Sequence, residues 1–248
     1  MSVAASPVEI VIPAFNEALR LERGFGILRA WLDANGLSAV RICIAENGSR
    51  DGTPELAEAL AKRYTGTRVV RLPFPSLADA LKVAWTDSTA EILGYCDADM
   101  STNPAHIAEA LKIFREYPEC VLVSGSRHLP ESDVSGRNRR RRFVSKIYAA
   151  CVRLALGTRF SDSACGFKFL RRAWFEKIAG SLVSRKFTLG AELALLAERH
   201  APGGLKEIPV RWEERTGTHV RLLPTIFSSA CGILKIRHCH GKANYPKA

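Results

Sequence analysis

The sequence predicts an α/β protein with a mostly parallel central sheet and helices on both faces of that sheet. Short apolar or β-branched runs alternate with segments of helical periodicity from residue 8 to residue 124. Polar or acidic turns follow three of the predicted strands, at residues 14–17, 46–53 and 97–101. Because parallel strands bring their carboxyl ends to one edge of a sheet, these turns should converge on a single ligand site.

The first half of the chain predicts four buried strands separated by three helices. Residues 8–12 are rich in β-branched side chains, and Pro13 ends the run. The next segment carries apolar residues every three or four positions from Leu21 to Leu32, and Asn35-Gly36 ends it. The other strands are expected over residues 40–45, 68–72 and 92–96, and the other helices over 54–64 and 77–85.

The second half is more basic. Residues 137–159 contain eight Lys or Arg and no Asp or Glu, and six more Lys or Arg follow from residue 215 onward, again without an acidic residue. Helical segments are expected at 104–117, 147–155, 174–178 and 193–199, and strands at 121–124 and 207–212. We expect one domain over residues 1–220 and a basic, amphipathic C-terminal segment over residues 221–248.

The bulk composition narrows the class of partner. A chain of 248 residues with a net charge of +11 points to an anionic partner, such as nucleic acid, anionic lipid or a phosphorylated substrate. The seven cysteines form no C-x-x-C pair, which argues against a zinc ribbon and favours reduced thiols in the cytosol. No apolar run is long enough for a transmembrane helix, and no signal peptide is indicated.

Asp97 and Asp99 follow the strand predicted over residues 92–96. Residues two apart in an extended chain point the same way, so the two carboxylates should face one side and repel each other. A hard divalent cation takes such oxygen ligands, often together with substrate phosphates. The pair therefore suggests a metal–diphosphate site, and the alternative is an acidic loop that caps the helix after Pro104.

Taken together, the ordered motifs between residues 8 and 237 resemble the family 2 glycosyltransferases, and most closely the dolichyl- or polyprenyl-phosphate glucose and mannose synthases. The motifs are Ile12-Pro13-Ala14-Phe15-Asn16-Glu17, Asn47-Gly48-Ser49-Arg50-Asp51-Gly52-Thr53, Asp97-Ala98-Asp99, Gly125-Ser126-Arg127, Asp162 with Cys165-Gly166-Phe167-Lys168, Glu192, and Glu207-Ile208-Pro209-Val210-Arg211-Trp212. The form Cys-Gly-Phe-Lys is more similar to the glucose-transferring branch.

The resemblance implies a GT-A nucleotide-sugar-binding fold and an inverting transfer of a hexose from UDP-glucose or GDP-mannose to a polyprenyl phosphate. The expected nucleotide-binding residues are Pro13, Asn16, Glu17, Glu46, Asp51 and Asp97. Asp97 and Asp99 would hold Mg²⁺ or Mn²⁺ against the diphosphate, with Asp99 as a catalytic residue. The enzyme would work at an anionic membrane surface, peripherally on its cytoplasmic face.

Arginine suits phosphate because its donors bind two oxygens at once. The expected ligands of the acceptor phosphate are Arg127 (also taken as catalytic), Arg139, Arg141, Arg142 and Lys168. For any single arginine of the 139–142 run, a solvated basic loop is an equal alternative. Asp162 and Glu192 are expected to contact the sugar or to be structural. Relatives that act on alcohols commonly place Asp before the later Glu, whereas Ala191 stands here.

The C-terminal segment has two interpretations. Its apolar residues could cover one side of a helix that lies on a bilayer, with basic residues meeting anionic head groups, or they could pack in the core. The apolar set is Leu222, Leu223, Ile226, Phe227, Ile233, Leu234 and Ile236, and the basic set is Arg221, Lys235 and Arg237.

Three departures from the family pattern concern the donor sugar. Glu46-Asn47 stands where relatives have paired Asp, residues 77–82 lack the usual Gly-Lys-Gly, and Ser101 replaces a Gln of mannose-type enzymes.

A family 2 transferase with a soluble or cell-envelope hydroxyl acceptor is the main alternative. A nucleic-acid binder is disfavoured because no interleaved aromatic residues are present for base stacking. A dinucleotide dehydrogenase is disfavoured because no G-x-G-x-x-G follows the first strand.

Overall fold

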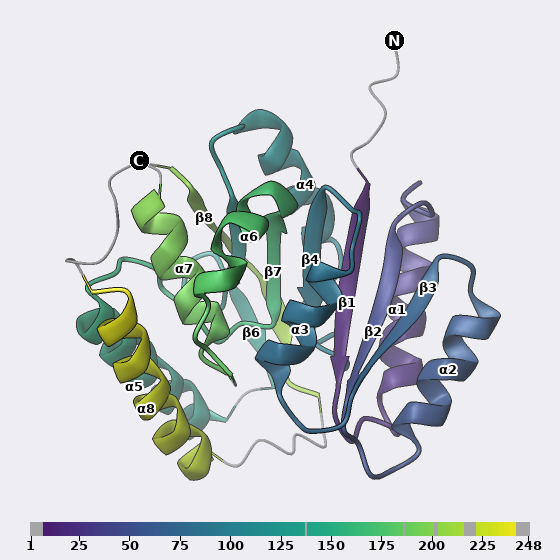
Figure 1. The fold of residues 1–248 in the computed structure, drawn as a ribbon, viewed down its shortest axis with the longest axis horizontal. Helices are drawn as coiled ribbons and strands as arrows, with labels where there is room; N and C mark the ends of the chain where they lie inside the picture. The colour runs from purple at the N-terminus through teal and green to yellow at the C-terminus, as the bar shows by residue number, and fades with distance from the viewer. Residues whose placement is uncertain (1–6, 137, 186, 201–202, 216–221, 242–248) are drawn as a thin grey trace.

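The computed structural model describes residues 7–136, 138–185, 187–200, 203–215 and 222–241. A twisted central sheet crosses the molecule, and helices cover both of its faces (Figure 1). The chain enters at one end of strand β1 and builds the sheet outward on both sides of that strand. This architecture confirms the predicted α/β class with a mostly parallel sheet.

The large sheet has seven strands in the order β3-β2-β1-β4-β7-β5-β8. Its strands are β1 (Val8–Ala14), β2 (Arg41–Asn47), β3 (Thr67–Leu72), β4 (Ile92–Cys96), β5 (Leu122–Ser126), β7 (Phe167–Arg171) and β8 (Leu205–Pro209). Strand β7 is antiparallel to both of its neighbours, β4 and β5, whereas every other pair is parallel. The six parallel strands therefore all end at one edge, which is the lower edge in Figure 1.

The helices form two layers because each strand alternates its side chains between the faces of the sheet. Ile10 and Ile12 of β1 point into one core and Val11 points into the other. One core packs against α1 (Leu21–Ala34), α2 (Thr53–Arg63) and α4 (His106–Glu116). The other packs against α3 (Leu77–Thr86), α5 (Arg139–Leu156), α6 (Arg172–Ile178), α7 (Leu189–His200) and α8 (Leu222–Cys239), with a short 3₁₀ turn η1 (Ala179–Ser181) after α6.

Two features of the second half differ from the sequence-based expectation. Strand β7 was not predicted, because its pattern Phe-Lys-Phe places Lys168 inside a strand that is buried on both faces. The single strand expected over residues 207–212 is divided at Val210. Its first part is β8, and its second part is β9 (Arg211–Glu213), which pairs with β6 (Asp133–Ser135) in a separate two-stranded sheet.

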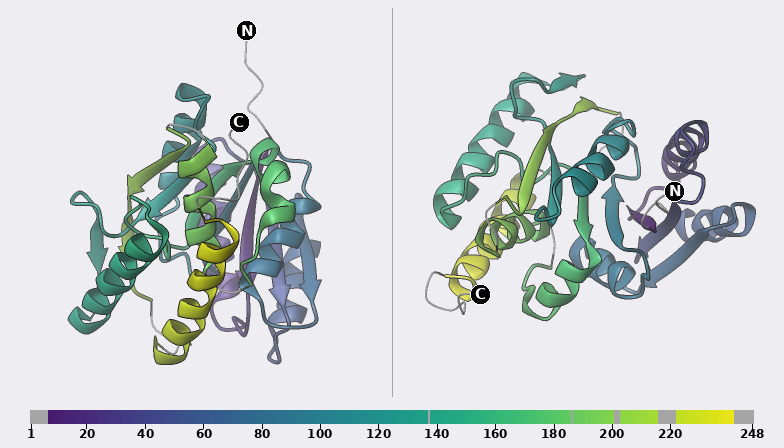
Figure 2. Two further views of the ribbon diagram at one scale, coloured as in Figure 1. Left: turned by 60° about the vertical axis from the view of Figure 1, so that its left-hand side comes forward. Right: turned by 90° about the horizontal axis from the view of Figure 1, so that it is seen from above.

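Helices α5 and α8 lie side by side along one flank of the molecule, as both views show (Figures 1 and 2). The side chains of Tyr148 and Ser229 are hydrogen-bonded, and Arg237 Nη1 donates to the Ala155 carbonyl at 3.3 Å. Tyr148 precedes Ala155 in α5, and their partners Ser229 and Arg237 follow in the same order in α8. The two helices therefore run in the same direction.

Helix α1 approaches the turn after β4 very closely. A Cβ built on Gly24 would lie 1.9 Å from the carbonyl oxygen of Ala98, which stands between the two aspartates. Two positions further along the same helix, Gly26 has no atom within 4 Å of such a Cβ. Glycine at position 24 therefore permits the contact between α1 and the aspartate turn, although glycine inside a helix costs about 1 kcal/mol.

The Gly24→Ala substitution is expected to destabilise the protein by about 1–3 kcal/mol, because the new methyl group must displace the backbone at Ala98. Urea unfolding monitored by tryptophan fluorescence measures this change. The matched control is Gly26→Ala on the same helix, which should stabilise by up to about 1 kcal/mol. Equal effects of the two substitutions would contradict the close approach.

Candidate functional site

The centre of the site is the tight turn that carries Asp97 and Asp99 at the end of β4. The Asp97 amide donates to the Gly166 carbonyl at 3.1 Å, and the Met100 amide donates to the Asp97 carbonyl at 2.9 Å. Met100 has a φ of 50°, and the Ser101 amide donates to Asp99 Oδ1 at 2.9 Å. These bonds fix the backbone of the turn, so both carboxylates are presented at the carboxyl edge of the sheet.

The backbone of Gly166 covers one side of the Asp97 carboxylate. A Cβ at this position would lie 1.9 Å from Asp97 Oδ2, so any larger residue would displace the carboxylate. Gly166 belongs to the Cys-Gly-Phe-Lys motif, whose glycine the sequence alone did not explain. Gly24 was missed altogether, and an isolated glycine inside a helical pattern was the available signal.

Three carboxylates influence one another at this edge. Burial, followed by the charge of Asp99, raises the pKa of Asp97, while Arg127, Lys168 and Arg20 act in the opposite direction. Burial also raises the pKa of Glu17 to about 7; Asp99 and Asp97 add to this, and Arg20 opposes it through an ion pair at 2.7 Å. A site that disfavours its own negative charges in this way favours a bound cation.

The donor set fits a hard divalent cation only in part. Asp97 and Asp99 offer the carboxylate oxygens that Mg²⁺ and Mn²⁺ prefer. Within the described ranges, however, no group of three or more His, Cys, Asp or Glu side chains is arranged to hold a metal. The aspartate pair would therefore bind such an ion together with oxygens from outside the protein, such as phosphate and water.

The turn after β1 and the turn after β2 are bound to each other. The Asn16 amide donates to Ser49 Oγ at 3.0 Å, and Asn16 Oδ1 accepts from the Arg50 amide at 2.9 Å. Asn16 adopts a φ of 55°, which asparagine tolerates better than most residues. The Asp51 carboxylate accepts from the Ala18 amide at 3.3 Å and from Thr53. The predicted convergence of these turns at one edge is thus observed.

A cavity of about 490 Å³ opens beside these turns. It is lined by Glu46, Gly48, Ser49, Arg50, Arg71, Leu72 and Pro73. The buried Glu46 carboxylate accepts from the Ser49 amide at 2.6 Å and lies 3.8 Å from Arg71 Nε. Arg71 was not singled out in the sequence, where it reads only as one residue of a strand. Pro13 lies within β1, close to where this strand ends at Ala14.

Arg127 is held inside the protein by Asp162. Its Nε and Nη2 atoms donate to the two carboxylate oxygens of Asp162 at 2.7 and 2.9 Å, and its amide donates to the same carboxylate at 3.1 Å. The side chains are only 8% and 1% exposed. Burial alone would raise the pKa of Asp162, but the charge and hydrogen bonds of Arg127 bring that pKa far below its usual range.

The ion pair limits what each of the two side chains can contact. Asp162 forms a buried ion pair with Arg127, and its expected sugar-contacting or structural role stays a prediction. The catalytic and phosphate-binding roles of Arg127 stay predictions, and its guanidinium already has a bidentate partner. The ring of Trp212 lies beneath this guanidinium, with its centroid at 5.6 Å. The charge of Arg127 lowers the pKa of Asp97 and so offsets part of the effect of burial.

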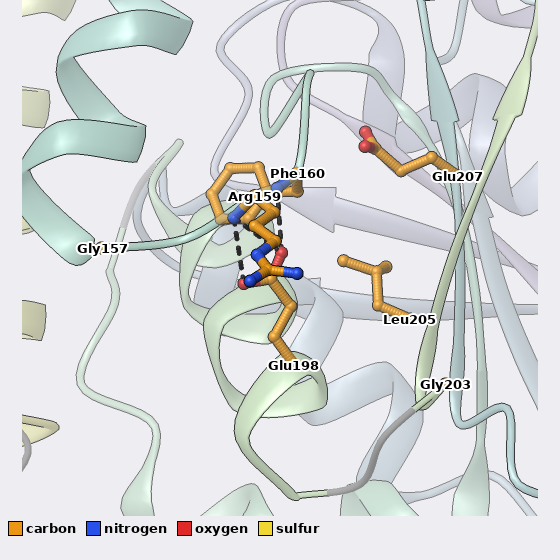
Figure 3. Close-up of a pocket in the computed structure, with 7 residues that line it drawn as sticks. All are labelled: Gly157, Arg159, Phe160, Glu198, Gly203, Leu205 and Glu207. Atoms are coloured by element: carbon orange, nitrogen blue, oxygen red, sulfur yellow. Dashed lines mark hydrogen bonds between the residues drawn. The ribbon is translucent and has the colours of Figure 1, made fainter.

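The segment that carries Asp162 is anchored by two further glutamates (Figure 3). Glu198 of α7 accepts from the amides of Arg159 and Phe160 at 2.9–3.1 Å. Glu207 of β8 accepts from Ser161 and from the Asp162 amide at 2.7–3.2 Å. A cavity of about 580 Å³ lies here, lined by Gly157, Arg159, Phe160, Glu198, Gly203, Leu205 and Glu207. Sequence reasoning noted Glu207 only as a motif residue and missed Glu198.

Lys168 and Glu192 are both fully buried. Lys168 Nζ donates to the Cys165 carbonyl at 2.7 Å and lies 5.9 Å from the centroid of the Tyr95 ring, and burial lowers its pKa. Its expected role as a phosphate ligand stays a prediction; the structure places this ammonium in the interior.

Glu192 joins three segments. Its carboxylate accepts from the amides of Val183 and Ser184 at 2.8 and 2.9 Å, and it lies 2.6 Å from His240 Nε2. Burial would raise the pKa of Glu192, but these hydrogen bonds lower it below the usual value. These contacts hold the loop at residues 183–184 and His240 just after α8, and the expected sugar-contacting or structural role of Glu192 stays a prediction.

The basic run lies in the first turn of α5. Arg142 is exposed, and its Nη2 donates to the Val134 carbonyl at 2.9 Å. The side chains of Arg139 and Arg141 lie outside the described residues, so their predicted role in phosphate binding stays a prediction.

The C-terminal helix divides the apolar residues that were expected to share one face. Ile233 and Ile236 are buried in the core, whereas Leu234 is 64% exposed. Ile233 and Ile236 thus pack in the core and Leu234 points outward, and both interpretations of the whole segment stay predictions. The side chains of residues 222–228 lie outside the described part. Among the described residues, no helix has the length and apolarity needed to cross a membrane.

We expect Asp162→Asn to destabilise the protein by about 3–5 kcal/mol at pH 7, since it leaves the buried Arg127 charge without a carboxylate. Because the pKa of Asp162 is lowered in the folded protein, the carboxylate stabilises the fold above the ordinary aspartate value of 3.8. The gap between wild type and variant should therefore be constant from pH 8 to about pH 5 and shrink below about pH 4.

Urea unfolding across this pH range gives the measurement. The control is Asp133→Asn, whose carboxylate is 70% exposed and 3.7 Å from Arg211, and it should change stability by less than about 0.5 kcal/mol. A gap that grows toward low pH would refute the assignment.

Glycosyltransferases are among the proteins whose sequences are similar to this chain. Glycosyltransferase AglD of Haloferax volcanii is 30% identical over 245 residues, which are 94% of this chain and 37% of that protein. The chain thus spans little more than a third of this relative. The dolichyl-phosphate beta-glucosyltransferase of Mus musculus is 23% identical, over 88% of this chain and 70% of the relative.

Solved structures share the fold. Glucosyl-3-phosphoglycerate synthase from Mycobacterium tuberculosis, in complex with Mn²⁺, UDP and glucosyl-3-phosphoglycerate, superposes with a TM-score of 0.66 at 20% identity and covers 94% of this chain and 80% of its own. The mannosyltransferase PcManGT from Pyrobaculum calidifontis, in complex with GDP-mannose and Mn²⁺, gives a TM-score of 0.60 at 16% identity over 97% of this chain and 71% of its own. The predicted nucleotide-sugar-binding fold is confirmed.

The family itself follows from the sequence match. Residues 9–179, more than half of the chain, match the family model described as glycosyl transferase family 2. The matched range includes the turns after β1 and β2, the aspartate turn after β4, and the Arg127–Asp162 pair. The chain belongs to the family 2 glycosyltransferases.

Proposed function

We propose that the protein is an inverting hexosyltransferase that uses Mg²⁺ or Mn²⁺ to move a hexose from a nucleoside-diphosphate sugar to a polyprenyl phosphate. The observation that carries the proposal is the aspartate pair at the carboxyl edge. Asp97 and Asp99 lie near Glu17, the pKa values of Asp97 and Glu17 are raised, and the cavity beside Glu46 opens at the same edge. Family membership supplies the reaction class.

The donor would bind across two turns. The cavity beside Glu46 suits a nucleoside, because a buried carboxylate accepts hydrogen bonds from base or ribose donors. The diphosphate would then extend toward Asp97 and Asp99. UDP-glucose and GDP-mannose are the donor candidates; solved relatives bind UDP with Mn²⁺ and GDP-mannose with Mn²⁺.

In the transfer, an oxygen of the acceptor phosphate attacks the anomeric carbon while the bond from that carbon to the diphosphate oxygen breaks. A bound divalent cation would supply Lewis-acid stabilisation of the leaving diphosphate. Asp97 and Asp99 would hold and orient that ion. The buried charges of Arg127 and Lys168 limit the repulsion between the carboxylates. A phosphate acceptor is already anionic and needs no general base, which agrees with the structural contacts of Glu192.

The lipid acceptor is supported by chemistry on one flank of the molecule. Residues 134–161 contain no acidic residue, and α5 presents several exposed basic side chains. The seven cysteines are free thiols, which suits the proposed cytoplasmic face of a membrane. The alternative acceptor is a soluble hydroxyl compound, because a fold neighbour holds glucosyl-3-phosphoglycerate.

Asp97→Asn and Asp99→Asn should each lower the rate of hexose transfer by about a thousandfold or more, equivalent to about 4 kcal/mol. Both variants should unfold at the same or a higher urea concentration without metal, since each removes one of two repelling charges. The rate is measured with saturating donor over a range of Mn²⁺ concentrations. Asp87→Asn, in an exposed turn after α3, is the control and should keep full activity. Near-normal turnover in either site variant would rule out the metal role.

The acceptor is tested by incubating the protein with Mn²⁺, UDP-glucose or GDP-mannose, and either a polyprenyl phosphate or a sugar alcohol. We expect a glycosylated lipid phosphate, detected by mass spectrometry, and no glycosylated alcohol. The matched control is the dephosphorylated polyprenol, which should be inert because it would need a general base. Transfer to the sugar alcohol alone would show that the hydroxyl-acceptor alternative is correct.

A further inference from the structure

Helix α5 carries a stripe of large apolar side chains that point away from the protein. Phe143 is 67% exposed, Ile147 is 47% exposed and Leu154 is 83% exposed. These residues are four and seven positions apart, so they lie on one face of the helix. Val152 and Leu156 are buried against the core on another face of the same helix. We call Phe143, Ile147 and Leu154 the α5 stripe.

Basic side chains border the α5 stripe. Among the side chains of α5 that the structure describes, the exposed basic ones are Arg140, Arg142, Lys146 and Arg153. Between Asp133 and Asp162 the chain has no acidic residue. An apolar stripe with basic borders matches the helices that lie in the head-group region of anionic membranes.

Helix α8 extends the same flank. It runs beside α5 in the same direction (Figure 2), and its exposed residues include Leu234, Lys235 and Arg237. Ile233 and Ile236 fix this helix to the core. The described part of α8 is therefore packed on the protein core beside α5.

The first half of α5 also lies close to the reaction site. His128 follows Arg127 directly after β5, and its Nε2 lies 3.2 Å from Ser145 Oγ of α5. His128 Nδ1 lies 3.0 Å from the Ser161 carbonyl, in the segment that leads to Asp162. Any partner surface that contacts the α5 stripe would thus lie beside the carboxyl edge of the sheet.

We propose that the α5 stripe and its basic border dock on the surface of an anionic lipid bilayer and place the carboxyl edge next to that surface. The inference rests on the proposed function, because a lipid acceptor requires such a position, and it assigns the docking to α5 rather than to the apolar residues of α8. Docking of a second copy through the same face is disfavoured because both stripes would bring their basic borders together. Nucleic acid would leave the apolar stripe without a partner.

The test is co-sedimentation of the full chain with vesicles, with no donor or acceptor present. One set of vesicles is phosphatidylcholine alone, and the other contains about one quarter phosphatidylglycerol. Wild type should bind the anionic vesicles and bind the neutral vesicles weakly. The double variant Phe143→Ser with Leu154→Ser should bind anionic vesicles about tenfold or more weakly. Val83→Ser, an exposed apolar residue of α3, is the matched control and should stay within about twofold of wild type.

The basic border is tested by Arg142→Gln with Lys146→Gln. This variant should bind anionic vesicles more weakly, and its binding should depend less on salt concentration. Lys112→Gln with Arg115→Gln, which removes two exposed charges from α4, is the matched control and should bind as wild type does. Circular dichroism and the melting temperature verify that each variant is folded. We expect folding to be preserved because the substituted side chains are exposed.

The outcomes separate this inference from the proposed function. Loss of vesicle binding in the stripe variant, with unchanged transfer to a water-soluble short-chain polyprenyl phosphate, supports the docking surface. Absence of vesicle binding in wild type, or equal binding in the stripe variant, overturns the inference even if lipid phosphate is glycosylated. Vesicle binding through the stripe without any transfer to lipid phosphate overturns the proposed acceptor and leaves the surface in place. A dimer that the stripe variant disrupts, seen by sedimentation velocity, would assign the face to a second copy.

Discussion

The repulsion between two carboxylates at the end of one strand is the constraint on which the rest of the site depends. Asp97 and Asp99 share a tight turn, with Glu17 nearby, and burial makes the charges of Asp97 and Glu17 costly. The fold tolerates this because Arg127, Lys168 and Arg20 lie close enough to offset part of it. Such an arrangement disfavours the empty site and favours a bound cation, which is the physical basis for proposing a metal–diphosphate site.

Arg127, one of the positive charges that act on Asp97, is itself held by a network in the second half of the chain. Asp162 binds Arg127 at two points, and the segment that carries Asp162 is bound by Glu198 and Glu207 from α7 and β8. Several motif residues therefore act as supports of the site. This explains why residues far from the aspartate turn in sequence belong to the same set of motifs, and why an acidic residue such as Glu192 need not be a catalytic base.

A transferase whose acceptor is a lipid phosphate needs a donor site and also a way to hold that site next to the membrane surface. Helix α5 connects the reaction site with such a surface. Its first half contacts the loop after β5 through His128 and Ser145, and its outer face is apolar with basic borders. Helix α8 supports α5 from the side, and its buried residues Ile233 and Ile236 give the flank a fixed place on the core.

The sequence by itself determined the class of the sheet, its first four strands and the edge at which the polar turns meet. These depend on local periodicity and on the rule that parallel strands end together, so Asp97, Asp99, Asn16 and Asp51 could be placed in advance. Only the tertiary structure decided that β7 is antiparallel with Lys168 buried, that the strand expected over 207–212 divides at Val210, and that Arg127 is paired with Asp162. It also decided that Gly24 and Gly166 are the residues that let the aspartate turn pack. These features depend on contacts between residues tens of positions apart. A local pattern of side chains cannot predict which distant residue will form an ion pair or which distant backbone will pack closely.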